Sequence, residues 1–142
     1  MTRIYCDTNI FLDYFFSRQD RFRDLGDFAY KIFRRTLDCE FEIIISDWLL
    51  YELNLYIKEN DLREFLEDFK NKNKIIKVYK NIDDIKNAKR MSKHFQDELH
   101  KILARKARAK YLITRNIKDY TITDELEIKL PENIWFIFNK LF

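Results

Sequence analysis

Residues 41–53 read FEIIISDWLLYEL and change from one hydrophobic pattern to another within a few positions. Phe41–Ile45 is a short apolar run rich in β-branched residues, which is typical of a buried strand. Ser46 is a good helix N-cap, and the leucines that follow it recur at helical spacing. The segment therefore predicts a strand that passes directly into a helix.

The same alternation extends in both directions along the chain. Short β-like runs are expected to form four more strands, at Arg3–Cys6, Ile75–Tyr79, Tyr111–Thr114 and Leu126–Leu130. Helical patterns are expected after Thr8, over Arg21–Leu37, from Asn60 or Asp61, and in a closing helix after Pro131 that carries Trp135, Phe136 and Phe138.

The stretch Asp84–Ala109 fits either one long helix or two. One helix of that length is unusual, so we expect a break near Gln96–Asp97. Alternating strands and helices imply a parallel sheet covered on both faces. We predict an α/β fold, a three-layer α/β/α sandwich around a mainly parallel sheet of 4–5 strands.

Composition excludes several classes of protein. The 142 residues contain no linker or repeat, so we expect one domain over residues 1–142. No apolar run approaches the ~20 residues of a membrane span, and the start of the chain lacks a signal-peptide pattern. A single glycine excludes GxGxxG and P-loop nucleotide sites. Two isolated cysteines argue against disulfides or structural zinc and favour a cytoplasmic protein.

Acidic and amide side chains follow the predicted strands. Asp7 comes directly after the first strand, Glu52 lies in the helix after the second, and Asp97 stands at a predicted helix start before the fourth. Asn116 and Asp119 follow that fourth strand. Ligand sites in parallel sheets lie beyond the carboxyl ends of the strands, so we expect these side chains to converge.

Converging carboxylates repel one another, and a divalent cation removes that penalty. Oxygen ligands favour Mg²⁺ or Mn²⁺, which keep some waters and take further ligands from phosphate groups. A bound cation also activates water and stabilises charge on a phosphoryl oxygen. The pattern therefore points to metal-dependent phosphodiester hydrolysis.

Each acid also has a simpler explanation. Asp7 and Asp97 are both good helix caps, and for Asp7 taken alone capping is the better explanation. Glu52 interrupts an apolar helix face but is equally consistent with a solvated position, and Asp119 suits an ordinary turn. The acids gain weight only from their shared position after strands.

Four motifs occur in a specific order: YCDTNIFLDYF, SDWLLYEL, FQDELHKILA and YLITRNIKDY. In this order they resemble PIN-domain ribonucleases, and look most like the VapC-type toxins of toxin–antitoxin pairs, from Ile4 to about Asn133. The resemblance implies an endoribonuclease that needs Mg²⁺ or Mn²⁺ and cleaves RNA. Its metal-binding acids would be Asp7, Glu52 and Asp97, with Asn9 and Thr114 supporting them by hydrogen bonding.

The fourth acidic position is open, because Asn116 stands where many family members have Asp, while Asp119 precedes an aromatic residue as in others. Since an amide is a poorer ligand than a carboxylate, binding of a second metal ion stays open too. The resemblance also implies a homodimer whose site is covered by a VapB-like antitoxin.

The stretch from Leu99 to Lys118 contains no acid and seven basic residues. Basic side chains beside Asp97 and Thr114 suit an RNA backbone, although most are also explained as a solvated helix face. Among them we single out Arg115 as a substrate-binding residue, because it adjoins the predicted site. His94 and His100 have no metal-ligand spacing, and we assign neither a catalytic role.

Three alternatives to a toxin nuclease remain. The chain is also consistent with a non-catalytic PIN-like domain that binds RNA or protein, since fold does not fix function. A housekeeping RNA-processing nuclease would have much the same sequence. A phosphohydrolase with Asp7 as nucleophile is disfavoured, because haloacid-dehalogenase-type enzymes need a second Asp where this chain has Asn9.

Overall fold

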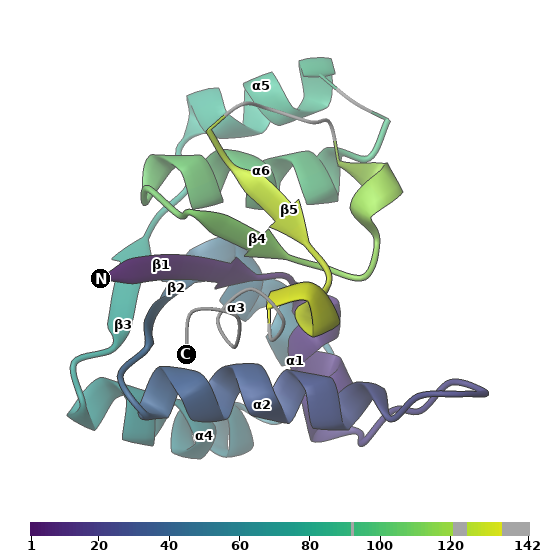
Figure 1. Ribbon diagram of the computed structural model, residues 1–142. Helices are drawn as coiled ribbons and strands as arrows, with labels where there is room; N and C mark the ends of the chain where they lie inside the picture. Colours follow the sequence, from purple (N-terminus) through teal and green to yellow (C-terminus); the bar gives the residue numbers. More distant parts are fainter. Residues whose placement is uncertain (92, 121–124, 135–142) are drawn as a thin grey trace.

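A five-stranded parallel sheet forms the centre of the protein in a computed structural model that describes residues 1–91, 93–120 and 125–134 (Figure 1). The strands lie in the order β3–β2–β1–β4–β5, and every neighbouring pair is parallel. Their bounds are β1 Thr2–Cys6, β2 Phe41–Ser46, β3 Ile75–Val78, β4 Tyr111–Ile113 and β5 Glu127–Lys129. All five predicted strands are therefore present.

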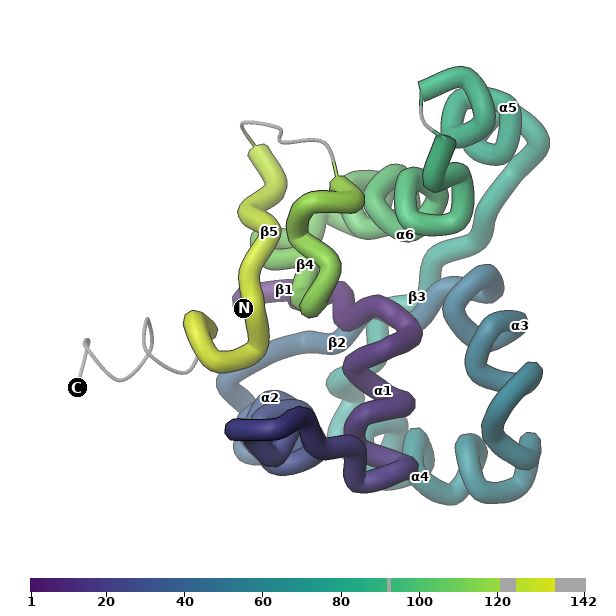
Figure 2. The backbone as a smooth tube through the Cα atoms, turned by 90° about the vertical axis from the view of Figure 1, so that its right-hand side faces the viewer, coloured from purple at the N-terminus to yellow at the C-terminus, as the bar shows by residue number. Residues whose placement is uncertain are grey.

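Helices connect the strands and cover both faces of the sheet. They are α1 Thr8–Phe15, α2 Leu25–Leu37, α3 Asp47–Asn54, α4 Glu59–Asn71, α5 Ile82–Met91 and α6 Phe95–Lys106, with a 3₁₀ turn η1 at Ile117–Asp119. Figure 2 shows α5 and α6 on one side of the sheet and α1, α2 and α4 on the other. This confirms the predicted three-layer α/β/α sandwich.

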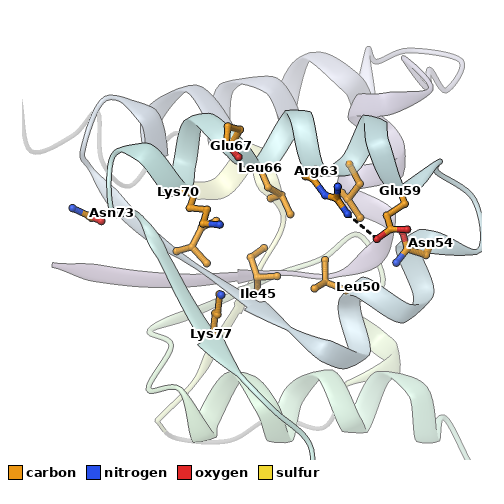
Figure 3. A pocket seen from close by; sticks show the side chains of 12 residues that line it. Ile45, Leu50, Asn54, Glu59, Arg63, Leu66, Glu67, Lys70, Asn73 and Lys77 are labelled. Carbon is orange, nitrogen blue, oxygen red and sulfur yellow. Dashed lines mark hydrogen bonds and ion pairs between the residues drawn. The ribbon is translucent and has the colours of Figure 1, made fainter.

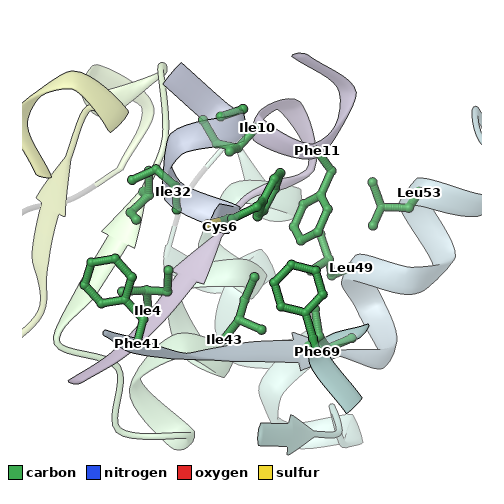
Figure 4. Packing of buried hydrophobic residues seen from close by; sticks show 14 of the residues in the cluster. Ile4, Cys6, Ile10, Phe11, Ile32, Phe41, Ile43, Leu49, Leu53 and Phe69 are labelled. Carbon is green, nitrogen blue, oxygen red and sulfur yellow. The ribbon is translucent and has the colours of Figure 1, made fainter. Parts of the chain in front are cut away.

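The core on the side of α1, α2, α3 and α4 is rich in aromatic rings (Figure 4). Phe11, Phe33 and Phe69 are buried there, and Phe65 packs against all three. Side chains alternate between the faces of a strand, so Ile4 and Cys6 of β1 point into this core. Burial of these rings stabilises the fold, because each ring removes a large apolar area from water.

The core under α5 and α6 is built from smaller side chains. Ala88, Ala104, Ala107 and Ala109 are buried beside leucines of α6. Tyr5, the residue of β1 between Ile4 and Cys6, enters this core and is fully buried. A phenol needs a hydrogen-bond partner when it is buried, so this face must contain polar groups.

Several helix ends differ from the prediction. Asp7 rather than Thr8 caps α1, because its carboxylate accepts the backbone N–H of Ile10. Helix α2 begins at Leu25 instead of Arg21, because Asp24 caps it by accepting the N–H of Asp27.

The other differences also concern helix starts. Helix α4 begins at Glu59 without a side-chain cap. The break between α5 and α6 falls between Met91 and Phe95, so the predicted break near Gln96–Asp97 was several residues late. Asp97 is therefore not an N-cap but lies in the first turn of α6.

The closing helix begins as expected, because residues 131–134 are helical. The positions of Trp135, Phe136 and Phe138 lie outside the described residues. In the described ranges, no helix is both long enough and apolar enough to span a membrane.

Candidate active site

The candidate site lies where the order of strands reverses. The chain builds β1, β2 and β3 toward one edge, then returns to place β4 on the opposite side of β1. At this switch the backbone N–H of Asp7, just after β1, donates to the carbonyl of Ile113 at the end of β4. Open parallel sheets bind ligands at such switch points, beyond the carboxyl ends of the strands.

Asp7 is buried at this point, with 3% of its surface exposed. The hydroxyl of Thr114 donates to its Oδ2 at 2.5 Å, and the N–H of Ile10 donates to its Oδ1. Burial raises the pKa of Asp7 from 3.8 to about 6, although the hydrogen bond from Thr114 opposes the shift. Ionisation of Asp7 is therefore costly without a cation, and the charge of Asp97 adds to that cost.

Glu52 reaches the site from the second turn of α3. The hydroxyl of Thr8 and the Nε2 of His100 both lie 2.5 Å from its Oε1. Burial works against ionisation of Glu52, but the hydrogen bonds from His100 and Thr8 outweigh it and lower the pKa of this carboxyl below its ordinary value. Glu52 is therefore a carboxylate at neutral pH.

Asp97 stands in the first turn of α6, half-buried. Burial raises the pKa of its carboxyl, and the charges of Asp119 and Glu52 raise it further. Three acids from separate parts of the chain are thus close enough to influence one another's ionisation.

The three acids line one cavity of about 240 Å³. Asn9, Thr8, Arg18 and His100 line the same cavity, together with the exposed side chains of Leu55 and Tyr56. The structure therefore brings together Asp7, Glu52, Asp97 and Asn9, as the sequence predicts, and it adds His100.

Asn116 and Asp119 take different positions. Asn116 lines a neighbouring cavity that shares Asn9 and Arg18 with the acid-lined one, and its backbone N–H donates to the Thr114 hydroxyl. Oδ1 of Asp119, on η1, lies 4.0 Å from Nε2 of His94. The charge of Asp119 raises the pKa of Asp97. Of the two candidates for a fourth acid, Asp119 is the one whose charge acts on Asp97.

Arg115 is engaged by protein carboxylates. Its guanidinium pairs with Asp13 at 2.9 Å and with Glu132 at 2.7 Å, and its side chain is 13% exposed. Two lysines of the basic stretch are similarly occupied: Lys101 is buried 3.8 Å from Glu98, and Lys106 pairs with Asp84 at 3.0 Å. The basic stretch therefore does not form one continuous solvated face.

The carboxylate oxygens at the site are suitable ligands for a hard divalent cation, but they do not form a complete coordination site by themselves. Among the residues that the structure describes, no three His, Cys, Asp or Glu side chains lie close enough to hold one ion. Mg²⁺ commonly binds through only one or two carboxylates and completes its shell with waters and substrate phosphates. Asp7 and Asp97 fit that type of site, with Glu52 nearby.

A second cavity, of about 390 Å³, lies between α4 and strands β2 and β3 (Figure 3). Its apolar lining includes Ile45, Leu50 and Leu66, and Glu59 at its rim pairs with Arg63. None of the three acids lines it. The chemistry of the acid-lined cavity is therefore separate from this apolar one.

The comparison with protein families agrees with this arrangement. A PIN-domain family model matches residues 3–118, which include all three acids as well as Asn9, Thr114 and Asn116. The chain belongs to the PIN-domain family. PIN domains are generally nucleases and generally use divalent metals, so this chain has a nuclease-type fold. No curated protein matches the chain.

Sequence reasoning missed His100 as part of the site of this PIN domain. The signal was spacing: His100 follows Asp97 by three residues, so the two share one face of α6. Tyr5 and Tyr120 were also missed. The phenol of Tyr120 lies 3.5 Å from Oδ2 of Asp7, and only the fold brings it there.

Proposed function

We propose that this PIN domain is an endoribonuclease that hydrolyses RNA phosphodiester bonds with a bound Mg²⁺ or Mn²⁺. The observation that carries the proposal is the acid-lined cavity at the switch point, where Asp7, Glu52 and Asp97 from three separate segments meet. A cavity lined by three carboxylates suits a hard cation and its phosphate ligand better than an apolar ligand.

In this proposal the residues of the chain have distinct roles. Asp7 and Asp97 hold the cation, and the buried Thr114 hydroxyl fixes the orientation of the Asp7 carboxylate. Glu52 supplies a third carboxylate, and Asp119 adds negative charge beside Asp97. When bound, the cation lowers the pKa of water and stabilises charge on the phosphate.

Cleavage of labelled single-stranded RNA tests the proposal. The purified protein should cleave with Mn²⁺ or Mg²⁺ and stop with EDTA. Asp97→Asn should lower the rate at least about a hundredfold, since even residues outside the ligand set of a metal site are worth 10–100-fold. Asp83→Asn, an exposed acid in the first turn of α5, is the matched control and should cleave normally.

The opposite result would favour the non-catalytic alternative. A folded protein that binds RNA tightly without turnover, with or without metal, would contradict the nuclease proposal. Asn116 would then be the first position to examine, because an amide stands there in place of a carboxylate.

We further propose that the nuclease is the toxin of a type II toxin–antitoxin pair and acts in the cytoplasm as a homodimer with a VapB-like antitoxin. The four ordered motifs support this proposal. Induced expression of the wild-type chain should then arrest growth, and Asp97→Asn should not. Normal growth with active enzyme would instead favour a housekeeping RNA-processing nuclease.

A further inference from the structure

A chain of buried hydrogen bonds links strands β2 and β1 to helix α6 and ends at Glu52. The backbone N–H of Leu49 donates to Oγ of Ser46 at 2.9 Å. Oγ of Ser46 lies 2.7 Å from the Tyr5 hydroxyl, which lies 2.6 Å from Nδ1 of His100. Nε2 of His100 then lies 2.5 Å from Oε1 of Glu52.

The side chains that lead to Glu52 are almost completely buried. Ser46 and Tyr5 are 0% exposed and His100 is 2% exposed. Polar groups this deeply buried are costly unless each donor and acceptor is paired. The direction of every hydrogen bond can therefore be worked out from the pairing.

One arrangement pairs every group. Glu52 accepts, so Nε2 of His100 carries a proton and donates it. A neutral imidazole then accepts at Nδ1, so Tyr5 donates to His100. Ser46 donates to Tyr5 and accepts from Leu49.

The reverse arrangement leaves a group unpaired. If Nδ1 of His100 carried a proton, Tyr5 would have to donate to Ser46. The Ser46 hydroxyl proton would then have no acceptor among the hydrogen bonds of the described residues. Pairing therefore favours the neutral Nε2–H tautomer of His100.

The same contacts distinguish the two oxygens of Glu52. Oε1 accepts from both His100 and the Thr8 hydroxyl, whereas Oε2 has no hydrogen-bond partner in the described part of the chain. Two donors from different helices hold the carboxylate by one oxygen and leave the other available in the acid-lined cavity.

We propose that His100 is a positioning residue for Glu52: the Ser46–Tyr5–His100 chain fixes Oε1 and reserves Oε2 for the cation and its phosphate substrate. The proposal rests on the proposed nuclease function. His100 acts on the reaction only through Glu52, because its two ring nitrogens are occupied by Tyr5 and Glu52.

Substitution of His100 tests the role by rescue. His100→Leu removes both hydrogen bonds, whereas His100→Gln keeps an amide N–H for Glu52 and a carbonyl oxygen for Tyr5. RNA cleavage is measured against Mn²⁺ concentration. His100→Leu should raise the half-saturating Mn²⁺ concentration or lower the maximal rate at least about tenfold, as expected for a residue that orients a ligand. His100→Gln should recover most of that loss.

Thr36→Val is the matched control. The Thr36 hydroxyl is a buried hydrogen-bonding group on the opposite face of the sheet, where it donates to the carbonyl of Ile32. Its removal should lower stability without changing the Mn²⁺ dependence. Full activity in His100→Leu, or equal loss in the Leu and Gln variants, would overturn the positioning role.

An NMR measurement decides the hydrogen-bond chain even if the wild-type protein cleaves no RNA. Long-range ¹H–¹⁵N spectra of ¹⁵N-histidine protein report the tautomer of each ring, and His94→Gln assigns the two rings. We expect His100 as the neutral Nε2–H tautomer, with ring shifts that move in Tyr5→Phe and in Glu52→Gln. An Nδ1–H tautomer, or no response to either variant, would refute the chain independently of the nuclease proposal.

Discussion

The two faces of the sheet are covered by different types of side chain. The face under α1, α2 and α4 is filled with aromatic rings, whereas the face under α5 and α6 combines alanines and leucines with a line of buried polar groups. The first face contributes stability through apolar area. The second face also contains the polar side chains of Ser46, Tyr5 and His100, whose hydrogen bonds lead to the candidate site.

This difference shows that one sheet can stabilise the fold with one face and support the candidate site with the other. Alternation along β1 sends Ile4 and Cys6 to the aromatic face and Tyr5 to the polar one. A strand at the centre of the sheet therefore anchors the core on one side and supports Glu52 on the other. Changes to the two faces should have separable effects.

The largest effect is expected on the aromatic face. Phe69→Ala removes a fully buried ring that packs against Phe33 and Phe65. It should lower the free energy of unfolding by about 3–5 kcal/mol, measured by urea denaturation. RNA cleavage per folded molecule should not change, because Phe69 lies outside the acid-lined cavity.

Phe22→Ala is the control for that experiment. Phe22 is 86% exposed, so its removal should change stability by no more than about 0.5 kcal/mol. Loss of specific activity in folded Phe69→Ala would show that the two faces are not separable.

The second effect concerns Asp7 in metal-free protein. Its pKa in the folded state, about 6, lies above the ordinary 3.8, so ionised Asp7 opposes folding above pH 6 and this cost fades as the pH falls toward 4. Asp7→Asn should therefore be more stable than the wild type in EDTA at pH 8, by up to about 3 kcal/mol, since each pKa unit is worth about 1.4 kcal/mol.

Urea denaturation at pH 8, 6 and 5 measures this gain, which should shrink steadily as the pH is lowered. Asp83→Asn, at an exposed position, should show no comparable trend. A gain that does not depend on pH would contradict the assignment of the cost to the Asp7 carboxylate.

The smallest effect tests the packing beside the aromatic face. A Cβ added at Gly26 would lie 2.8 Å from the carbonyl oxygen of Asp13 and 3.2 Å from Cα of Ser17. Gly26→Ala should therefore cost about 1–2 kcal/mol, although alanine favours helices by about 1 kcal/mol over glycine. Thermal unfolding checks the sign, and a stabilised variant would show that α1 and α2 can separate at no cost.

Much of the fold could be predicted from local pattern. The apolar run Phe41–Ile45 and the cap Ser46 are signals contained in a few adjacent residues, and the structure has both. Helix starts were less predictable, because several nearby polar residues compete to be the cap. Asp7 took that position before α1, which left the Thr8 hydroxyl free to donate to Glu52.

The candidate site was also predictable from the sequence only in part. Asp7 and Glu52 after strands, and Asp97 before the fourth strand, were expected to converge at one edge of the sheet, and the structure lines one cavity with all three. Arg115 was chosen for its closeness in sequence to the site, yet its guanidinium is paired with Asp13 and Glu132. Closeness along the chain does not determine which charge a flexible side chain meets.

The sequence by itself determined the alternation of strands and helices, the parallel sheet and the acids that follow its strands, because these depend on local periodicity and on the direction of each strand. Only the tertiary structure decided that Tyr5, Ser46, Glu52 and His100 form one hydrogen-bonded chain. These residues come from four different elements, and their pairing depends on how helices pack across a sheet, which no short stretch of sequence specifies.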